Sequence, residues 1–204
     1  MTHPDVDAWD AWHPRQLADR LRDLTIPWYV AAGWAVDLFR GEQTREHEDL
    51  EIAVPAARFG LLPPLFPGLE FWVPDGEGAL VPMTPAALGG ESHQTWAWDP
   101  AAAKWRFDIF REPHDGDTWI CRRDEARIRR PYREIIRHTG DGLPYLAIEA
   151  ALLFKAKHVR AKDVADFTGA LPLLSRAERG WLDAALGLVH PQHPWRNRLR
   201  AVWP

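Results

Sequence analysis

The chain has few of the residues that mark secreted or membrane proteins. It contains a single cysteine, Cys121, among 204 residues, so it cannot form an internal disulfide. No apolar run approaches the roughly 20 residues that cross a bilayer, because Pro, Gly or charge interrupts every apolar stretch. The N-terminal residues also lack the basic and then apolar order of a secretory signal. We therefore expect a cytoplasmic protein that does not insert into membranes.

The chain also lacks an excess of basic residues. Its formal net charge is −4, which argues against a general nucleic-acid-binding protein, although local basic patches remain open. Hydrophobic residues make up 46% and charged residues 26%, the proportions of a globular protein. The unusual number is twelve Trp, which fits either an aromatic core or a pocket lined by flat rings.

The first fifty residues predict a helix, a strand, a second helix and a second strand. Leucines at helical spacing after Pro14 predict a helix over residues 14–24. Strand-forming residues at 28–31 are followed by a helical stretch that closes near Gly41. Residues 49–54 then alternate polar with apolar, which indicates a half-buried strand.

The rest of the chain divides into a strand-rich part and a helical part. Pro, Gly and short apolar runs between residues 55 and 100 indicate loops and short strands. The best strand candidates are residues 70–73, 94–98 and 105–110, and the best helix candidates are residues 147–161, 163–174 and 178–189. We therefore expect a mixed α and β first part followed by a helical last third.

Two carboxylates mark the strand at residues 49–54. Asp49 and Glu51 are two residues apart, so both project from one face of the strand and can share a metal ion. Mg²⁺ prefers carboxylate oxygens, with substrate phosphates and water completing its shell. Asp108, on the strand at 105–110, is the natural third carboxylate. Taken alone, the pair is more simply explained as part of a solvated strand face.

Gly33 lies between a predicted strand and a predicted helix. A glycine there lets backbone N–H groups approach a phosphate, with the helix dipole adding to the attraction. Turn geometry alone would also explain a glycine at this position.

A longer pattern surrounds these residues. Residues 32–41 read Ala-Gly-Trp-Ala-Val-Asp-Leu-Phe-Arg-Gly, and residues 44–52 read Thr-Arg-Glu-His-Glu-Asp-Leu-Glu-Ile. This pair of segments resembles the aminoglycoside nucleotidyltransferase family. The stretches 144–149, 152–157, 160–167 and 193–195 resemble later blocks of the same family.

The resemblance implies an α+β fold of the DNA polymerase β type, with a mixed sheet backed by helices. It implies a nucleotidyltransferase domain over residues 1–140 and a helical C-terminal lobe over residues 141–204. It also implies an enzyme that uses Mg²⁺ and a nucleoside triphosphate, with ATP as the expected nucleotide.

Carried over by position, the resemblance assigns roles to six residues. Asp49 and Glu51 would hold the metal, and Asp108 would either complete the metal site or act as general base. Gly33 would cradle the triphosphate, with Arg45 and Lys155 as phosphate partners. For Arg45 a surface ion pair, and for Lys155 a helix salt bridge, are the alternatives.

The sequence departs from the family pattern at two positions. Ala32 replaces the first glycine of a Gly-Gly pair, which adds a methyl group to a turn that favours positive φ. Ile148 replaces a proline ahead of the helical glutamate. We also expect His190 and His193 to cap or pack rather than to bind metal, because no acidic or Cys partner lies close to them in sequence.

The expected partner is a small-molecule acceptor with a hydroxyl group, such as an aminoglycoside or a lincosamide. An acidic cleft would attract a polycation of that kind. Two alternatives stay open, namely an RNA acceptor, as in nucleotidyltransferase toxins, and a catalytically silent nucleotide-binding module. The oligomeric state is not predicted.

Overall fold

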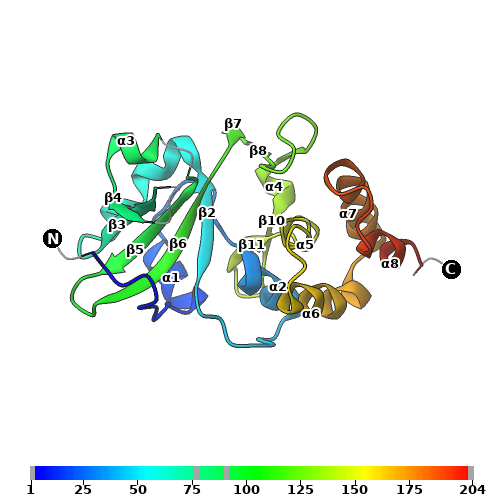
Figure 1. The fold of residues 1–204 in the computed structure, drawn as a ribbon, viewed down its shortest axis with the longest axis horizontal. Helices are drawn as coiled ribbons and strands as arrows, with labels where there is room; N and C mark the ends of the chain where they lie inside the picture. The colour runs from blue at the N-terminus through cyan, green and yellow to red at the C-terminus, as the bar shows by residue number, and fades with distance from the viewer. Residues whose placement is uncertain (1–2, 76–78, 90–91, 202–204) are drawn as a thin grey trace. The chain divides into compact units, whose positions relative to one another are not determined.

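The chain contributes two stretches to each of two structural units (Figure 1). A computed structural model describes residues 3–75, 79–89 and 92–201. Unit 1 comprises residues 1–30 and 46–114, and unit 2 comprises residues 31–45 and 115–204. The expected domains, residues 1–140 and 141–204, are continuous stretches and stay a prediction, whereas each observed unit combines two separate stretches.

A mixed sheet runs through unit 1 (Figure 1). Its strands are β1 (Tyr29–Val30), β2 (Glu51–Pro55), β3 (Glu70–Pro74), β4 (Leu80–Pro82), β5 (Gln94–Asp99) and β6 (Lys104–Glu112). They follow the order β1-β2-β6-β5-β3-β4. Strands β2 and β6 are parallel, and the other neighbouring pairs are antiparallel. The strands predicted from alternation are all present.

Short helices lie in the connections around these strands. They are α1 (Pro14–Arg20), the 3-10 helices η1 (Ala56–Leu61) and η2 (Pro63–Leu65), and α3 (Pro85–Leu88). Helix α1 begins at Pro14 as predicted, with His13 and Gln16 forming a capping box, but it ends at Arg20 rather than at residue 24. Phe107 of β6 packs against Trp12 and Phe66.

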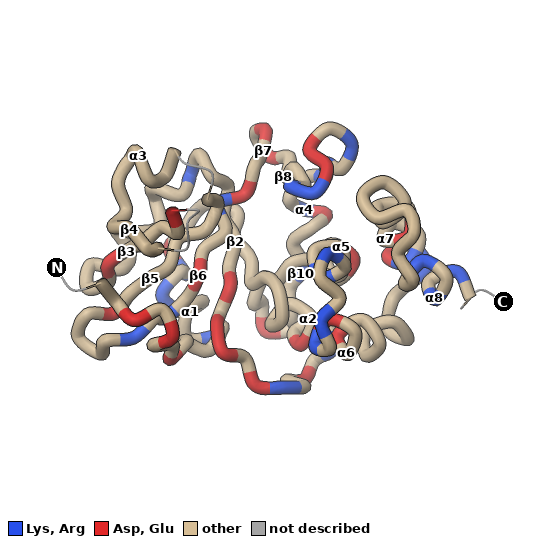
Figure 2. Tube along the Cα trace, in the orientation of Figure 1, with Lys and Arg blue, Asp and Glu red and all other residues tan. Residues whose placement is uncertain are grey.

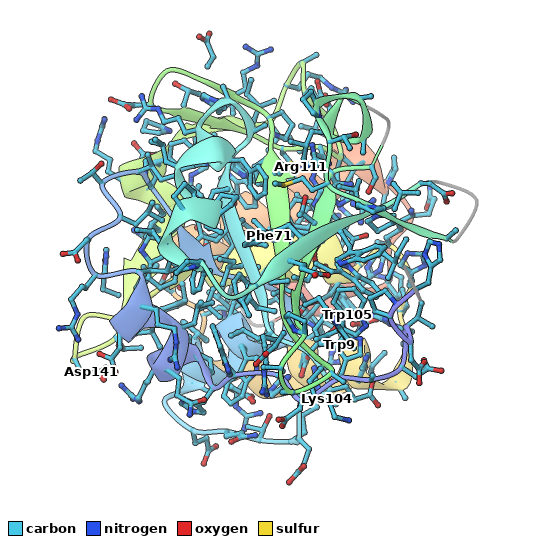
Figure 3. The ribbon with its side chains drawn as sticks, turned by 90° about the vertical axis from the view of Figure 1, so that its left-hand side faces the viewer. Trp9, Phe71, Lys104, Trp105, Arg111 and Asp141 are labelled. Atoms are coloured by element: carbon cyan, nitrogen blue, oxygen red, sulfur yellow. The ribbon has the colours of Figure 1, made fainter. Side chains whose placement is uncertain are left out.

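Tryptophans form a cluster in the same unit. Trp105 is fully buried, and the rings of Trp9, Trp96 and Trp98 lie 6.3, 5.4 and 4.8 Å from its ring. Figure 3 shows Trp9 and Trp105 side by side. Trp72 belongs to the same hydrophobic cluster. The cluster is therefore both a core, through Trp105, and a partly exposed aromatic surface, through Trp9, Trp96 and Trp98.

Unit 2 is mostly helical. Its helices are α2 (Ala32–Arg40), α4 (Tyr132–Ile135), α5 (Ile148–Lys155), α6 (Ala161–Ala170), η3 (Leu171–Leu173), α7 (Arg176–Val189) and α8 (Trp195–Ala201). Its strands are the antiparallel pairs β8 (Thr118–Ile120) with β9 (Arg129–Pro131) and β10 (Ile136–His138) with β11 (Pro144–Leu146). Strand β7 (His114–Asp115) lies where the chain passes from unit 1 to unit 2.

Helix α5 is the centre of unit 2. It is buried along most of its length and packs against α2, α6 and α7 (Figure 1). Phe167 of α6 stacks on Trp195 of α8 at 4.1 Å, nearly parallel. Helix α2 ends at Gly41, whose φ of 78° is the left-handed C-cap that the sequence predicts.

The predicted fold class is confirmed, because the structure is α+β with a mixed sheet and a helical last third. Among the described residues, no helix is long and apolar enough to cross a membrane.

Candidate active site

Glu51 and Asp108 lie opposite each other on neighbouring strands. In the parallel pair β2 and β6, Glu51 is in register with Asp108, and the backbone N–H of Asp108 donates to the carbonyl of Leu50 at 2.8 Å. Side chains at paired positions project from the same face of a sheet. The strand order therefore brings together two of the three carboxylates that were expected to act together.

Asp49 joins them through its charge. It precedes β2 by two residues, and the acidic positions of this segment are visible along β2 and the loop before it in Figure 2. Burial of Asp108, which is 4% exposed, raises the pKa of its carboxyl to about 7, and the negative charge of Asp49 adds to that rise. Asp49, Glu51 and Asp108 thus lie in one neighbourhood of unit 1.

The two oxygens of Asp108 differ in their surroundings. Oδ2 accepts a 2.6 Å hydrogen bond from Nε2 of Gln94, which opposes the rise in the pKa of Asp108. Oδ1 is buried and accepts no hydrogen bond of good geometry among the described residues, although the nearby backbone N–H groups of Thr95 and Ile109 help to lower the pKa of Asp108. A buried oxygen without a partner is costly unless a cation or a proton satisfies it. The donor set of three carboxylates therefore fits Mg²⁺, which prefers oxygen ligands.

The described residues contain no group of three or more His, Cys, Asp and Glu side chains arranged as a ready metal site. The assignment of Asp49, Glu51 and Asp108 as metal ligands stays a prediction. Mg²⁺ usually keeps several waters and substrate oxygens in its shell, so it needs fewer protein ligands than a closed cage supplies.

Trp96 lies beside Asp108 on β5, the strand that flanks β6 on the side away from β2. Strand β5 pairs with β6 so that Trp96 is in register with Asp108, and Gln94, two residues away, faces the same side. Trp96 is half-buried and contacts Trp9 and Trp105 edge to face. One face of the sheet thus carries carboxylates on β2 and β6 and aromatic rings on β5.

Unit 2 contains the residues that were expected to bind phosphate. Gly33 is buried in the first turn of α2, and the N-cap Ala31 provides no side-chain cap for the helix. The first N–H groups of an α-helix have no partner within the helix, so this end offers donors and a favourable dipole to an anion. Gly33 thus lies within the first turn of α2 and not between the strand and the helix, and its role in phosphate binding stays a prediction.

Ala32 adopts a backbone conformation that favours glycine. Its φ is 48°, in the left-handed region. The methyl group does not prevent the turn, but it makes the conformation costly by about 1 kcal/mol or more. Ala32, which replaces a glycine of the family pattern, thus keeps the left-handed conformation at a cost in backbone strain.

Asp37 and Thr44 connect the two halves of the motif. Oγ1 of Thr44 donates to Oδ1 of Asp37 at 2.6 Å, and Asp37 is 3% exposed. The backbone N–H groups of Gly41 and Glu42 also donate to the carbonyl of Asp37. The hydrogen bond between Thr44 and Asp37 holds the loop after α2 in place, which explains the spacing of these two residues in the sequence pattern.

Lys155 is buried at the end of α5 in a network of charges. Its Nζ lies 2.7 Å from Oδ2 of Asp166 and 3.5 Å from Oδ1 of Asp163. Arg160 also pairs with Asp163 at 2.8 Å, and Arg45 approaches Asp166 at 3.9 Å. Lys155 and Arg45 therefore form the ion pairs that were the alternative explanation for them. Their role as phosphate partners stays a prediction.

His193 takes the capping role that was expected. Its Nδ1 accepts a hydrogen bond from the backbone N–H of Trp195, the first residue of α8, at 3.2 Å. The ring of His193 also packs edge to face on Trp195.

Sequence reasoning did not identify Gln94 and Trp96 as site residues. Alternation over residues 94–98 indicates a strand, but only its pairing with β6 shows that these two side chains face Asp108. Asp163 and Asp166 lie on α6 and their partner Lys155 on α5, so the sequence alone does not show that they form ion pairs.

One family model matches part of the chain. The family model of aminoglycoside-2''-adenylyltransferase matches residues 15–60, which include Gly33, Arg45, Asp49 and Glu51. No curated protein sequence matches the chain.

Solved structures share the fold along most of the chain. The crystal structure of ANT(2'')-Ia in complex with adenylyl-2''-tobramycin has a TM-score of 0.55 at 13% identity and covers 92% of this chain and 94% of its own. The solution structure of the antibiotic-resistance factor ANT(2'')-Ia has a TM-score of 0.54 at 14% identity, with 92% and 91% covered. The lincomycin-bound lincosamide antibiotic adenylyltransferase LnuA has a TM-score of 0.52 at 17% identity, with 76% and 92% covered.

The resemblance predicted from the sequence is confirmed by the family match over residues 15–60. The fold is shared with the solved structures along most of the chain.

Proposed function

We propose that the protein transfers a nucleotidyl group, with ATP as the expected donor, to a hydroxyl of a small-molecule antibiotic. The observation that carries this proposal is the register of Glu51 with Asp108, with Asp49 close enough to influence the same carboxyl. Three carboxylates on one sheet face suit a reaction in which charge on phosphate oxygens must be neutralised. We expect the reaction to take place in the cytoplasm, where nucleoside triphosphates are available.

Asp49 and Glu51 are the residues that we assign to Mg²⁺. Both are half-buried, so their oxygens remain accessible. When bound, Mg²⁺ supplies neutralisation of the charge on the triphosphate. The buried Oδ1 of Asp108 is the third oxygen that supports a cation in this neighbourhood.

Asp108 is the residue that we assign as general base. Without a bound metal ion the pKa of this carboxyl is about 7. Mg²⁺ held by Asp49 and Glu51 would lower that pKa, which would keep Asp108 in the carboxylate form that accepts a proton. The hydroxyl oxygen of the acceptor forms a bond to the α-phosphorus, and the bond from that phosphorus to the bridging β-phosphate oxygen breaks. Pyrophosphate leaves, and the hydroxyl proton passes to the carboxylate of Asp108. Gln94 orients this carboxylate through its hydrogen bond to Oδ2.

In unit 2 we assign phosphate binding to the N-terminal turn of α2 at Gly33, with Arg45 and Lys155 as cationic partners. Two carboxylates lie close to the ammonium of Lys155, and an ammonium has three N–H donors. One donor is thus available for a phosphate oxygen while the ion pairs persist.

The acceptor class follows from the surroundings of Asp108. A cationic aminoglycoside would be attracted by Asp49 and Glu51, and its sugar rings would lie on the face of Trp96. A lincosamide offers hydroxyls on a sugar ring of the same kind. ANT(2'')-Ia carries adenylyl-2''-tobramycin and LnuA carries lincomycin in their solved structures, which supports an acceptor of one of these two classes.

The test is a screen for product mass. The protein is incubated with Mg²⁺, each of the four nucleoside triphosphates, and a panel of aminoglycosides and lincosamides. The proposal expects an acceptor whose mass increases by one nucleoside monophosphate. Nucleotide binding by calorimetry without any product across the panel would instead indicate a silent nucleotide-binding module. Modified tRNA in a parallel incubation would indicate an RNA acceptor.

A further inference from the structure

A pocket of about 550 Å³ lies in unit 1 where β2 and β6 end. Its walls are mainly apolar and come from the 3-10 helices after β2 and from the segment that leads into α3. Its lining includes Phe59, Gly60, Pro63, Met83, Leu88 and Arg111. This volume lies within the range of small-molecule sites in proteins.

The pocket lies on the other face of the sheet from Asp108. Successive side chains of a strand point to opposite faces, so Asp108 and Arg111, three residues apart on β6, project to opposite sides. Figure 3 shows Arg111 and Trp105 towards opposite ends of β6. The pocket is therefore separate from the carboxylate site.

Arg111 is an unusual residue for such a pocket. It is 8% exposed, and its guanidinium donates to backbone carbonyls. Nη1 donates to Leu88 at 2.6 Å, and Nη2 donates to Ser92 and, at 3.4 Å, to Gln94. Nε is buried and has no hydrogen-bond partner in the described part of the chain.

The charge of Arg111 is thus poorly compensated. No carboxylate pairs with its guanidinium among residues 3–75, 79–89 and 92–201. Burial lowers the pKa of Arg111, which shows the cost of this charge in an apolar environment. Buried charges are normally paired, because an unpaired charge costs several kcal/mol.

We propose that this pocket binds a small carboxylate with an apolar body, with the carboxylate on Arg111 and the apolar part among Phe59, Pro63 and Met83. Three of the five N–H groups of the guanidinium donate to backbone carbonyls, which leaves the second N–H of Nη1 to donate to a carboxylate oxygen. A single positive charge balances a monoanion and not a phosphate dianion, and the apolar walls would penalise the second charge. The ring of Phe59, centred 6.0 Å from the guanidinium carbon, supplies apolar surface next to the charge.

Octanoate is the probe for this proposal, and calorimetry on the full chain is the measurement. Octanoate is expected to bind the wild-type protein, and 1-octanol, which has the same apolar chain without the charge, is expected to bind at least about tenfold more weakly. Arg111→Met, which keeps the apolar stem, should weaken octanoate binding by a similar factor. Arg111 also holds three carbonyls, so this variant could lose its fold.

A second variant tests the pocket without touching the guanidinium. A Cβ placed on Gly60 meets no atom within 4 Å, so Gly60→Trp can fold while filling the space that the pocket provides. Gly68→Trp is the matched control, because Gly68 has equally open surroundings in the same unit and does not line the pocket. Octanoate should bind Gly68→Trp as it binds the wild type and Gly60→Trp at least about tenfold more weakly.

Three results would overturn the proposal. They are no octanoate binding to the wild-type protein, equal binding of octanoate and octanol, or equal octanoate binding by Gly60→Trp and Gly68→Trp. Each of these can occur whether or not the protein transfers nucleotides, because the pocket and the carboxylate site are tested with different ligands.

Discussion

Glu51 and Asp108 face the same side of the sheet from paired positions on parallel strands, although they lie far apart in the chain. The pairing places a half-buried carboxylate next to one that is almost completely buried. Asp49 adds a third negative charge to the neighbourhood and contributes to the raised pKa of Asp108. This concentration of like charge is costly for the fold, and the proposed nucleotidyl transfer depends on it.

The stability of the protein should depend on pH through Asp108. Its pKa of about 7 is above the value in an unfolded chain, so the native state holds the proton more tightly. The contribution of Asp108 to the free energy of unfolding is therefore greatest at low pH, and it is lost as the pH rises through about 7. In Asp108→Asn that loss is absent, so the variant should be more stable than wild type near neutral pH, by on the order of 2 to 4 kcal/mol.

Urea unfolding with a metal chelator, at about pH 4.5 and about pH 8, measures this difference. The increase in the free energy of unfolding that Asp108→Asn produces should be clearly larger at the higher pH. Asp19→Asn, an exposed position on α1, is the control and should show no such increase. The same gain for Asp108→Asn at both pH values would show that the carboxyl titrates as in an unfolded chain.

Replacing Ala32 by glycine should stabilise the protein and strengthen nucleotide binding. At a φ of 48° glycine avoids the steric cost of the methyl group, although it also increases the entropy of the unfolded chain. The expected net gain is up to about 1 kcal/mol in the free energy of unfolding. Ala103, whose φ is 52°, gives the matched control in unit 1.

Both glycine variants should gain stability, and only Ala32→Gly should lower the Kd for ATP, measured by calorimetry. If Ala103→Gly changed the Kd as much as Ala32→Gly does, the N-terminal turn of α2 would have no specific role in phosphate binding.

The elements with strong periodicity were predictable from the sequence, and those without it were not. The end of α2 at Gly41 and the alternation in β2 follow from local chemistry alone. The short strands and helix between residues 118 and 146 have no such pattern, because each is only three or four residues long. Their conformation depends on tertiary contacts that a local pattern does not contain.

The candidate site was predictable in part for a related reason. Asp49, Glu51 and Asp108 follow from the motif and from alternation, but the side-chain hydrogen bond from Gln94 depends on the pairing of β5 with β6. Arg111 is followed directly by Glu112 and resembles a surface position in the sequence. Its burial depends on η1 and on the carbonyls of Leu88 and Ser92, which only the folded chain brings to it.

Removing the charge of Lys155 should destabilise unit 2. Lys155→Met would leave Asp163 and Asp166 buried without the ammonium between them, at a cost of about 3 to 5 kcal/mol. Lys157→Met, at an exposed position just after α5, is the control and should change stability by about 0.5 kcal/mol or less. Thermal unfolding compares the two, and similar midpoints would mean that the buried network contributes little.

Trp96 should determine acceptor binding and not the chemical step. Trp96→Ala removes the ring next to Asp108, so the KM for the acceptor should rise about tenfold while kcat changes little. Trp98→Ala also removes a contact with Trp105, but Trp98 is in register with Trp105 and not with Asp108. It should lower stability and leave the KM unchanged. A fall in kcat with an unchanged KM in Trp96→Ala would contradict the assignment.

The most direct test of the central claim is the rate of acceptor modification in Asp49→Asn. The variant, the wild-type protein and Glu48→Gln, a neighbouring exposed carboxylate, are incubated with ATP, Mg²⁺ and an acceptor identified in the screen, and the product is measured by mass. The account predicts that Asp49→Asn loses at least about a hundredfold in rate while its circular dichroism spectrum is unchanged. It predicts that Glu48→Gln retains the wild-type rate. Product formation by Asp49→Asn at the wild-type rate would contradict the account.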